Sequence, residues 1–144
     1  MLRGFQVAAF LFIAAAAVAQ TQTVWDSVYS AAQADRGKDS YTGACASCHG
    51  RGLEGGHIFG SRTRTAPALK GELFLANWYG LTAGELFLRI SQTMPLDHPQ
   101  SLSDETSTDL VAYILQTNGF PAGSRDLPAD VDVLKNIQIA AQKK

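Results

Sequence analysis

The sequence predicts an all-α domain with long loops, and two capped helices and one glycine-rich stretch support this. Thr82 and Glu85 form a T-x-x-E capping box ahead of apolar residues at four-residue steps. Ser103 begins a second helix whose first turn is acidic. Residues 50–69 contain five glycines and favour an extended loop. Because no stretch is convincingly a strand, we expect a mostly helical fold.

An amphipathic first helix is expected from Val24 to about Tyr41, with apolar residues on one side and charged residues on the other. Gly37 lies inside this pattern, where glycine costs roughly 1 kcal/mol relative to alanine. Such a glycine often marks the close approach of another backbone. We therefore expect a second segment to cross the helix near Gly37.

Two helices are expected after the glycine-rich loop. Residues 71–78 (GELFLANW) predict a short helix, followed by a turn at residues 77–81. The helix that Thr82 caps carries Leu86, Ile90 and Met94 on one face. It ends at Pro95, because a residue that precedes proline is disfavoured in the helical conformation.

The C-terminal half predicts a loop, a strong helix and a shorter one. Residues 95–102 contain two prolines and no periodicity, so they form the loop. The helix capped by Ser103 ends at Gly119 and Pro121. A shorter helix is expected within residues 130–139. The strong helix has an apolar stripe of Leu110, Val111, Ile114 and Leu115.

Length and charge narrow the class of protein. A chain of 144 residues that is 46% hydrophobic suits one globular domain and is short for two. A formal net charge of −1 argues against nucleic acid or an anionic membrane surface as the main partner. Arg62 and Arg64 form the conspicuous basic pair, on an expected loop. They are either solvated or a docking patch for an acidic redox partner.

The N-terminal residues predict a signal peptide over residues 1–19. Arg3 supplies the positive charge, Phe5 to Val18 the apolar stretch and Ala17 to Ala19 the small-residue cleavage pattern. We then expect a domain over 20–144, with a core at about 24–123 and a C-terminal extension over 124–144. The expected location is periplasmic or otherwise exported. An uncleaved membrane anchor is the alternative, although about fourteen apolar residues are short of the roughly twenty that span a bilayer.

The chemistry of the chain centres on Cys45 to His49 (CASCH). Cys-x-x-Cys-His is the signature of covalent haem c attachment. On a helical turn, Cys45 and Cys48 share a face and two thioether bonds can hold the ring. His49 then lies next to the iron as its axial ligand. A thioredoxin-like pair requires a βαβ pattern, which is missing, and a zinc site would have to be completed by the two other histidines.

A second axial ligand is expected on the opposite face of the haem. Met94 is the sole methionine of the expected mature chain and ends an amphipathic helix directly before Pro95. This position can direct its thioether into the core, although methionine also simply fills gaps in cores. His57 and His98 are the alternative ligands. Ligation by His49 and Met94 raises the reduction potential relative to two histidines.

The chain resembles the class I (monohaem) cytochromes c. The likeness extends from Val24 to Gly123, and within the class the chain is similar to haem c domains of bacterial quinoprotein alcohol dehydrogenase systems. The segments that carry it are CASCHGRGLEGG, APALKGELFLANW, ISQTMP and DLVAYILQTNGFPAG. The first is highly specific, and the others are persuasive together through their order and spacing.

The resemblance implies further roles. Pro67 matches the proline whose carbonyl accepts a hydrogen bond from the proximal histidine and fixes its orientation. Trp78 matches an aromatic residue that packs beside the haem and binds a propionate; an ordinary core tryptophan is the alternative. Gly37 matches the close crossing of the first and last helices, to which Tyr113 and Ile114 contribute. Residues 57–65 depart from the pattern and look like an insertion.

The expected function is electron transfer by one covalently bound haem c. Motifs for a nucleophile, a phosphate cradle or a catalytic carboxylate pair do not rise above background, so we expect a carrier and not an enzyme. The expected partners are redox proteins, either a dehydrogenase or a terminal oxidase. Two alternatives are a haem-bearing subunit of an exported dehydrogenase and a ligand-binding or peroxidatic haem protein with an open sixth site.

Overall fold

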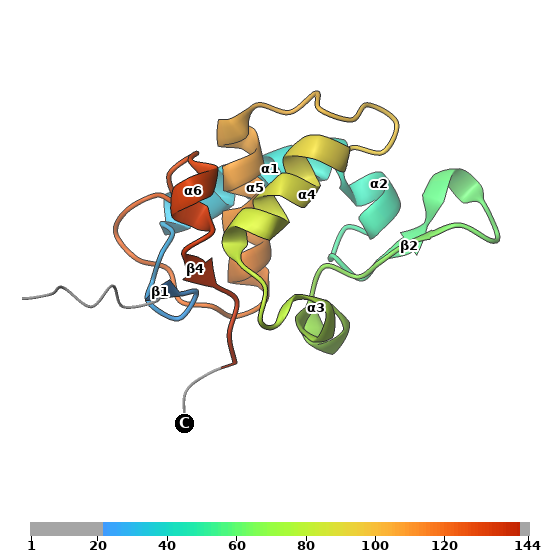
Figure 1. Ribbon diagram of the computed structural model, residues 1–144. Coiled ribbons are helices and arrows are strands. Elements are labelled where there is room, and N and C mark those ends of the chain that lie inside the picture. The colour runs from blue at the N-terminus through green and yellow to red at the C-terminus, as the bar shows by residue number, and fades with distance from the viewer. Residues whose placement is uncertain (1–21, 142–144) are drawn as a thin grey trace, which may run out of the picture.

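The computed structural model describes residues 22–141, and within this range the chain is mostly helical (Figure 1). The strands are only two residues long, and the helices supply the framework. The expected signal segment, residues 1–19, lies outside the described residues. The elements are β1 (Gln22–Thr23), α1 (Ala31–Ala44), α2 (Ala46–His49), β2 (Gly56–His57), the 3-10 helix η1 (Ile58–Gly60), β3 (Thr65–Ala66), α3 (Gly71–Trp78), α4 (Ala83–Thr93), α5 (Asp104–Thr117), α6 (Val131–Leu134) and β4 (Ile137–Gln138).

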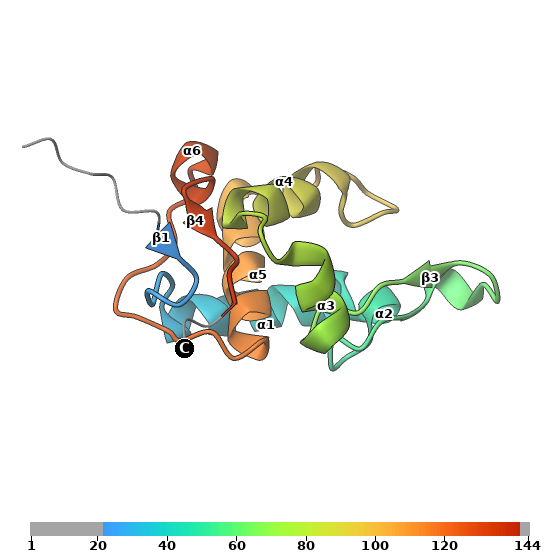
Figure 2. The same cartoon turned by 60° about the horizontal axis from the view of Figure 1, so that its bottom comes forward.

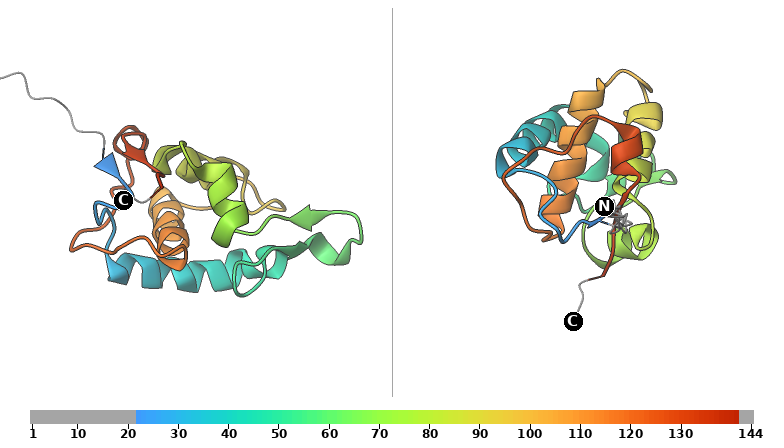
Figure 3. Two further views of the ribbon diagram at one scale, coloured as in Figure 1. Left: turned by 90° about the horizontal axis from the view of Figure 1, so that it is seen from below. Right: turned by 60° about the vertical axis from the view of Figure 1, so that its left-hand side comes forward.

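Helices α1 and α5 cross at the centre of the fold (Figure 3). At the crossing Gly37 is buried, and a Cβ atom there would overlap the carbonyl oxygen of Asp109 and lie 2.9 Å from Cβ of Tyr113. The two backbones are therefore closer than any side chain at position 37 would allow. The expectation that a second segment crosses the first helix at this glycine is confirmed.

The expected start of the first helix at Val24 is wrong. Helix α1 begins at Ala31, because the side chain of Ser30 accepts a hydrogen bond from the backbone N–H of Gln33 at 3.0 Å. Val24 is still buried, but its N–H donates to the carbonyl of Gln138. Ser27 has φ 55, a left-handed turn that is incompatible with a continuous helix. Apolar residues before the cap thus enter the core from a turn.

The later helices follow their predicted signals. Helix α3 has the predicted bounds, and α4 begins with the predicted capping box between Thr82 and Glu85. The side chain of Ser103 caps α5 by accepting from the N–H of Thr106. Helix α5 ends at Thr117, and Gly119 follows with φ 82, the left-handed position after a helix.

The C-terminal segment, residues 120–141, is built into the same hydrophobic core as the helices. It contains α6, which packs on α4, and β4, which pairs in parallel with β1. The side chain of Gln33 on α1 holds this segment, since it donates to the carbonyl of Leu127 at 3.1 Å and accepts from its N–H at 2.8 Å. Although residues 124–144 were expected as an extension, four of them are buried in the core: Leu127, Leu134, Ile137 and Ile139.

Residues 50–69 form two different structures. One part folds back beneath α2, and residues 56–66 form a hairpin in which β2 and β3 are antiparallel. The hairpin projects from the body at the end opposite α6, β1 and β4 (Figures 1 and 2). The expectation of a loop without strands is corrected here, because strands of two residues are too short to show the alternation that identifies a strand in a sequence.

Among residues 22–141, no helix has both the length and the apolar composition that crossing a bilayer requires.

Candidate functional site

Cys45, Cys48 and His49 lie on the short turn that follows α1. Cys45 ends α1 and precedes α2, and the N–H groups of Cys48 and His49 both donate to its carbonyl, at 3.1 and 2.9 Å. Both thiols are free and partly exposed, and burial raises the pKa of the Cys45 thiol to about 11. The helical turn therefore presents two unbridged cysteines, three positions apart, next to the histidine.

The ring of His49 is held by the backbone carbonyl of Pro67. Nδ1 lies 2.9 Å from this oxygen, and because a carbonyl only accepts, Nδ1 carries the hydrogen and donates it. His49 is 9% exposed, and no hydrogen bond to Nε2 is present among the described residues. In the neutral ring Nε2 then has a free lone pair, which is the arrangement of a histidine that ligates a metal.

Two loops, one before and one after the hairpin of residues 56–66, are hydrogen-bonded around His49 and fix the position of Pro67. The N–H of Gly55 donates to the carbonyl of His49 at 2.7 Å, and the N–H of Leu69 donates to the carbonyl of Leu53 at 2.8 Å. Gly55 has φ 81, and a Cβ atom there would lie 2.8 Å from the carbonyl oxygen of Ala66. Only glycine fits both the conformation and the space. The two loops thus clamp the histidine and its hydrogen-bond acceptor together.

Two residues in this clamp were not singled out from the sequence. Tyr41 on α1 donates its hydroxyl to the carbonyl of Gly50 at 2.6 Å and so anchors the end of α2. Asn118 at the end of α5 donates to the carbonyl of Leu69 at 3.0 Å and accepts from the N–H of Gly71 at 2.9 Å. These three bonds join side chains to backbone groups nine or more positions away, so no local pattern reveals them. The position of Asn118 before Gly119 was a signal only for the end of a helix.

Met94 caps the C-terminus of α4. Its N–H donates to the carbonyl of Ile90 at 3.0 Å, and its backbone is extended at φ −119 and ψ 151. The residue is half-buried, whereas Ile90, one turn earlier, is buried. The chain leaves the helix at this point, so Met94 lies where α4 meets the loop over residues 95–102.

The two histidines weighed as alternative ligands are both exposed. His57 lies on strand β2 of the hairpin, and His98 lies in the loop after α4 with Nδ1 3.3 Å from a carboxylate oxygen of Asp97. In residues 22–141 no group of three or more His, Cys, Asp or Glu side chains is placed to hold a metal ion.

The two tryptophans differ in what their indole N–H groups do. Nε1 of Trp25 donates to the carbonyl of Ala140 at 2.8 Å, which ties the N-terminal segment to the C-terminal one. Trp78 stacks on Phe74 with ring centroids 5.9 Å apart, and its Nε1 makes no hydrogen bond to any residue within 22–141. The indole N–H of Trp78 is therefore free for an acceptor such as a carboxylate.

These residues fit a covalently bound haem. Free thiols at Cys45 and Cys48, an imidazole with an open Nε2 at His49 and a thioether at Met94 are the donors that haem c takes. Partly buried apolar side chains from this turn and from the segment after Pro67 pack against the core: Ala46, Leu69, Leu75 and Trp78.

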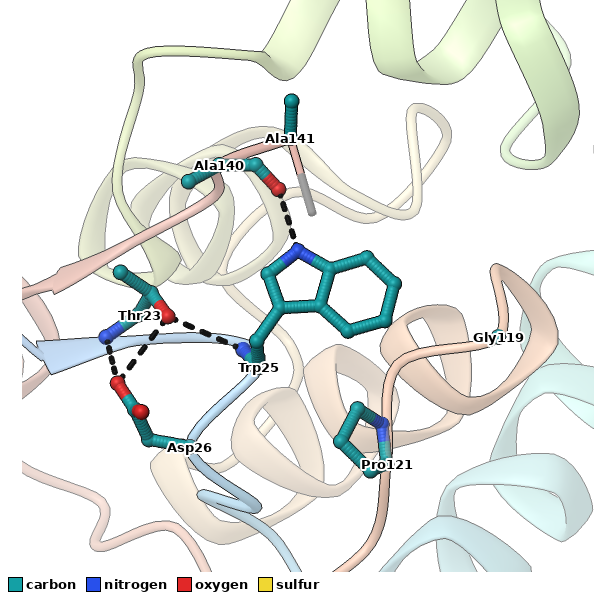
Figure 4. Close-up of a pocket in the computed structure, with 7 residues that line it drawn as sticks. All are labelled: Thr23, Trp25, Asp26, Gly119, Pro121, Ala140 and Ala141. Atoms are coloured by element: carbon teal, nitrogen blue, oxygen red, sulfur yellow. Dashed lines mark hydrogen bonds between the residues drawn. The ribbon is translucent and has the colours of Figure 1, made fainter. Parts of the chain in front are cut away.

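A hollow elsewhere on the surface does not involve these residues. It has a volume of about 430 Å³ and lies between the N- and C-terminal segments (Figure 4). Trp25 and Pro121 form its apolar wall, and Thr23 and Asp26 its polar side. The donor groups described above are absent from its lining.

Comparison with known proteins identifies the family of the chain. The family model described as "Cytochrome C oxidase, cbb3-type, subunit III" matches residues 32–114. A solved structure of the sulfane dehydrogenase SoxCD from Paracoccus pantotrophus is similar at 22% identity and a TM-score of 0.45, over 76% of this chain and 59% of that chain. Among curated proteins no match is found. The chain is a monohaem cytochrome c, a haem-based electron-transfer domain, and belongs to the family of the cbb3-type cytochrome c oxidase subunit III.

Proposed function

We propose that the chain is an exported single-haem electron carrier in which His49 and Met94 are the two axial ligands. Haem c supplies one iron that exchanges a single electron between its ferrous and ferric states. The observation that carries this proposal is the orientation of His49, whose Nδ1–H is committed to Pro67 and whose Nε2 is left open.

The residues around His49 keep it fixed during electron exchange. Because the carbonyl of Pro67 accepts from Nδ1, the ring cannot rotate and Nε2 stays aimed at one point. The clamp between Gly55 and His49 holds the backbone as well. A fixed ligand keeps the structural change between the two redox states small, which suits a carrier.

Met94 is the proposed ligand on the other face. It is half-buried at the end of α4, while His57 and His98 are exposed on segments that extend away from the core. A thioether that shares the apolar face of α4 reaches a buried ring more directly than either histidine. Methionine ligation also closes the sixth position, which disfavours a peroxidatic or ligand-binding role.

We propose a dehydrogenase as the electron donor and a terminal oxidase as the acceptor. The family description names an oxidase subunit, and this supports the oxidase side. The predicted signal segment over residues 1–19 supports export to a compartment where haem c is attached. The alternative function, as a haem-bearing subunit of a dehydrogenase complex, uses the same site. It differs from a free carrier only in that the chain stays bound to its partner.

The test is the absorption spectrum of the ferric haem-loaded protein, as wild type and as Met94→Ala. We expect a methionine-to-iron charge-transfer band in the wild type that the variant lacks, and carbon monoxide binding to the reduced variant alone. His57→Ala and His98→Ala are the matched controls and should retain the band. A band that survives Met94→Ala would contradict the ligand assignment. A bis-histidine spectrum in the wild type that is lost in His57→Ala or in His98→Ala would contradict it as well.

A further inference from the structure

The hairpin of residues 56–66 has an aromatic side chain at its tip with no cover. Phe59 is 63% exposed and lies in η1 between β2 and β3. Its φ of 50 and ψ of 37 are left-handed, a conformation that costs a non-glycine residue about 1 kcal/mol or more. Most of the apolar surface of Phe59 is therefore left in water by the fold of its own chain.

Positive charge is concentrated at this end of the molecule. Arg62 and Arg64 are both exposed, and no ion pair within residues 22–141 involves them. Residues 51–70 carry four Lys or Arg and one Glu, whereas the other described residues carry five Lys or Arg and twelve Asp or Glu. Three of these acids are at or near α6, at the opposite end (Figures 1 and 2): Asp126, Asp130 and Asp132. The molecule thus has a positive hairpin end and a negative body.

The hairpin is joined directly to the haem-binding turn. Its first strand follows Gly55, whose N–H donates to the carbonyl of His49. Its second strand leads into Pro67, whose carbonyl holds the ring of His49. β2, η1 and β3 all pack near α2. Whatever binds the hairpin therefore lies beside the electron-exchanging site.

We infer that this hairpin is the docking site for a redox partner protein with an acidic surface around an apolar depression. Arg62 and Arg64 pair with the carboxylates of that surface, and Phe59 enters the depression. This inference rests on the proposed electron-carrier function, because its partner must exchange electrons with the haem. Aromatic and arginine side chains are the residues enriched at protein interfaces. The hairpin itself carries two of the four basic residues of residues 51–70, and four is the lower limit of the four to eight typical of segments that bind anionic lipid.

The test uses the haem-loaded protein on a gold electrode coated with a mixed carboxylate- and methyl-terminated monolayer. Voltammetry at low ionic strength measures the amount of bound protein and its electron-transfer rate. We expect Arg62→Gln/Arg64→Gln to lower binding by about tenfold, since opposite charges steer association. The control Lys38→Gln/Arg125→Gln removes the same charge from exposed positions on the body and should change binding less than twofold. Equal losses in the two double variants would overturn the inference.

Phe59→Asn tests the apolar part of the contact. Asparagine tolerates the left-handed conformation of position 59, so the hairpin keeps its shape while the aromatic ring is removed. We expect binding to fall several-fold on the mixed monolayer and to stay unchanged on a monolayer of carboxylates alone. An unchanged affinity on the mixed monolayer would overturn the role of Phe59.

Two further measurements separate the inference from its rivals. Sedimentation with phosphatidylcholine–phosphatidylglycerol vesicles at 0.15 M salt should leave the protein in solution, and sedimentation that depends on Phe59 would assign the hairpin to a lipid surface instead. Analytical ultracentrifugation should show a monomer, and a dimer lost in Arg62→Gln/Arg64→Gln would assign the hairpin to a second copy of the chain. The solution spectrum of each variant tests the haem site independently, so failure of docking and failure of the electron-carrier proposal are distinguishable.

Discussion

The molecule has two regions that are stabilised in different ways. The helical framework consists of α1, α5 and the C-terminal segment 120–141, and the side chain of Gln33 joins α1 to that segment by two hydrogen bonds. The proposed haem-binding side consists of residues 45–69 and Met94. There, hydrogen bonds from the N–H groups of Gly55 and Leu69 hold the backbone around His49. The two thiols are unbridged, and the Nε2 of His49 makes no hydrogen bond within residues 22–141.

The difference shows how a small domain can prepare a cofactor site. The framework gains its stability from buried side chains and from a close helix crossing. On the haem-binding side, hydrogen bonds to the backbone and to Nδ1 of His49 fix the position of the ring and leave its Nε2 open. Changes to the framework should therefore affect stability, and changes to the haem-binding side should affect the haem.

The largest effect is expected from Cys45→Ser/Cys48→Ser. Both thioether bonds are lost, so the haem should be fully extracted by acidified acetone, whereas it should stay with the wild-type chain. Haem staining after denaturing electrophoresis provides the measurement. Retention of haem by the double variant under denaturing conditions would show that the attachment lies elsewhere.

A large loss of stability is expected from Gly37→Ala in the framework. The new Cβ atom overlaps the carbonyl of Asp109, and overpacking of this kind costs about 2–3 kcal/mol. Gly43→Ala on the same helix is the control, because a Cβ there meets nothing within 4 Å and should raise stability by about 0.5–1 kcal/mol. Urea unfolding of the haem-loaded proteins measures both. Similar effects of the two variants would mean that α1 and α5 do not cross closely.

The two tryptophans allow a matched test of the two regions. Trp25→Phe removes the hydrogen bond to Ala140 and should lower the free energy of unfolding by about 1 kcal/mol with the midpoint potential unchanged. Trp78→Phe removes an indole N–H that is free to bind a haem propionate, and should shift the potential and its pH dependence. Potentiometric titration over a pH series is the measurement. A midpoint potential that shifts in Trp25→Phe and stays unchanged in Trp78→Phe would contradict the assignment.

The smallest effect is expected at Asp126, which lies on the C-terminal segment. Its bonds to the Ser30 hydroxyl and then to Arg36 hold the pKa of its carboxyl below the ordinary value of 3.8. The ionised form is thus favoured by folding, so its stabilising effect is present above pH 3.8 and is lost as the pH falls through the lower folded pKa. Asp126→Asn should lower the urea midpoint at pH 6 and match the wild type in strong acid. Asp35→Asn, at an exposed position on α1, is the matched control and should leave the urea midpoint at pH 6 unchanged.

The signals that predicted the fold are local ones. Thr82 with Glu85 and Ser103 define helix starts by bonds within three residues, and these positions are confirmed. Cys45 to His49 are also a local signal, because the whole motif lies within five consecutive residues. The first helix was placed too early because apolar residues before Ser30 have the composition of a helix but enter the core from a turn. Tertiary contacts, and not helix propensity, determine the conformation of those residues.

The parts that could not be predicted depend on distant contacts. The bond from Gln33 to Leu127 spans 94 positions and brings the C-terminal segment into the core. The hairpin at residues 56–66 has strands of two residues, which leave no periodicity to detect. Pro67 could be connected to His49 only through the resemblance to class I cytochromes c, since nothing in the spacing itself places the carbonyl beside the ring.

The midpoint potential of the haem-loaded protein, as wild type and as Met94→His, tests the proposed His49/Met94 carrier most directly. We expect one electron per chain in a reversible titration and a clearly lower potential for the variant, because replacing methionine by histidine favours the ferric state. A potential that is the same in both proteins, or a titration that is not reversible, would contradict the proposal that Met94 ligates the iron of a single-electron carrier.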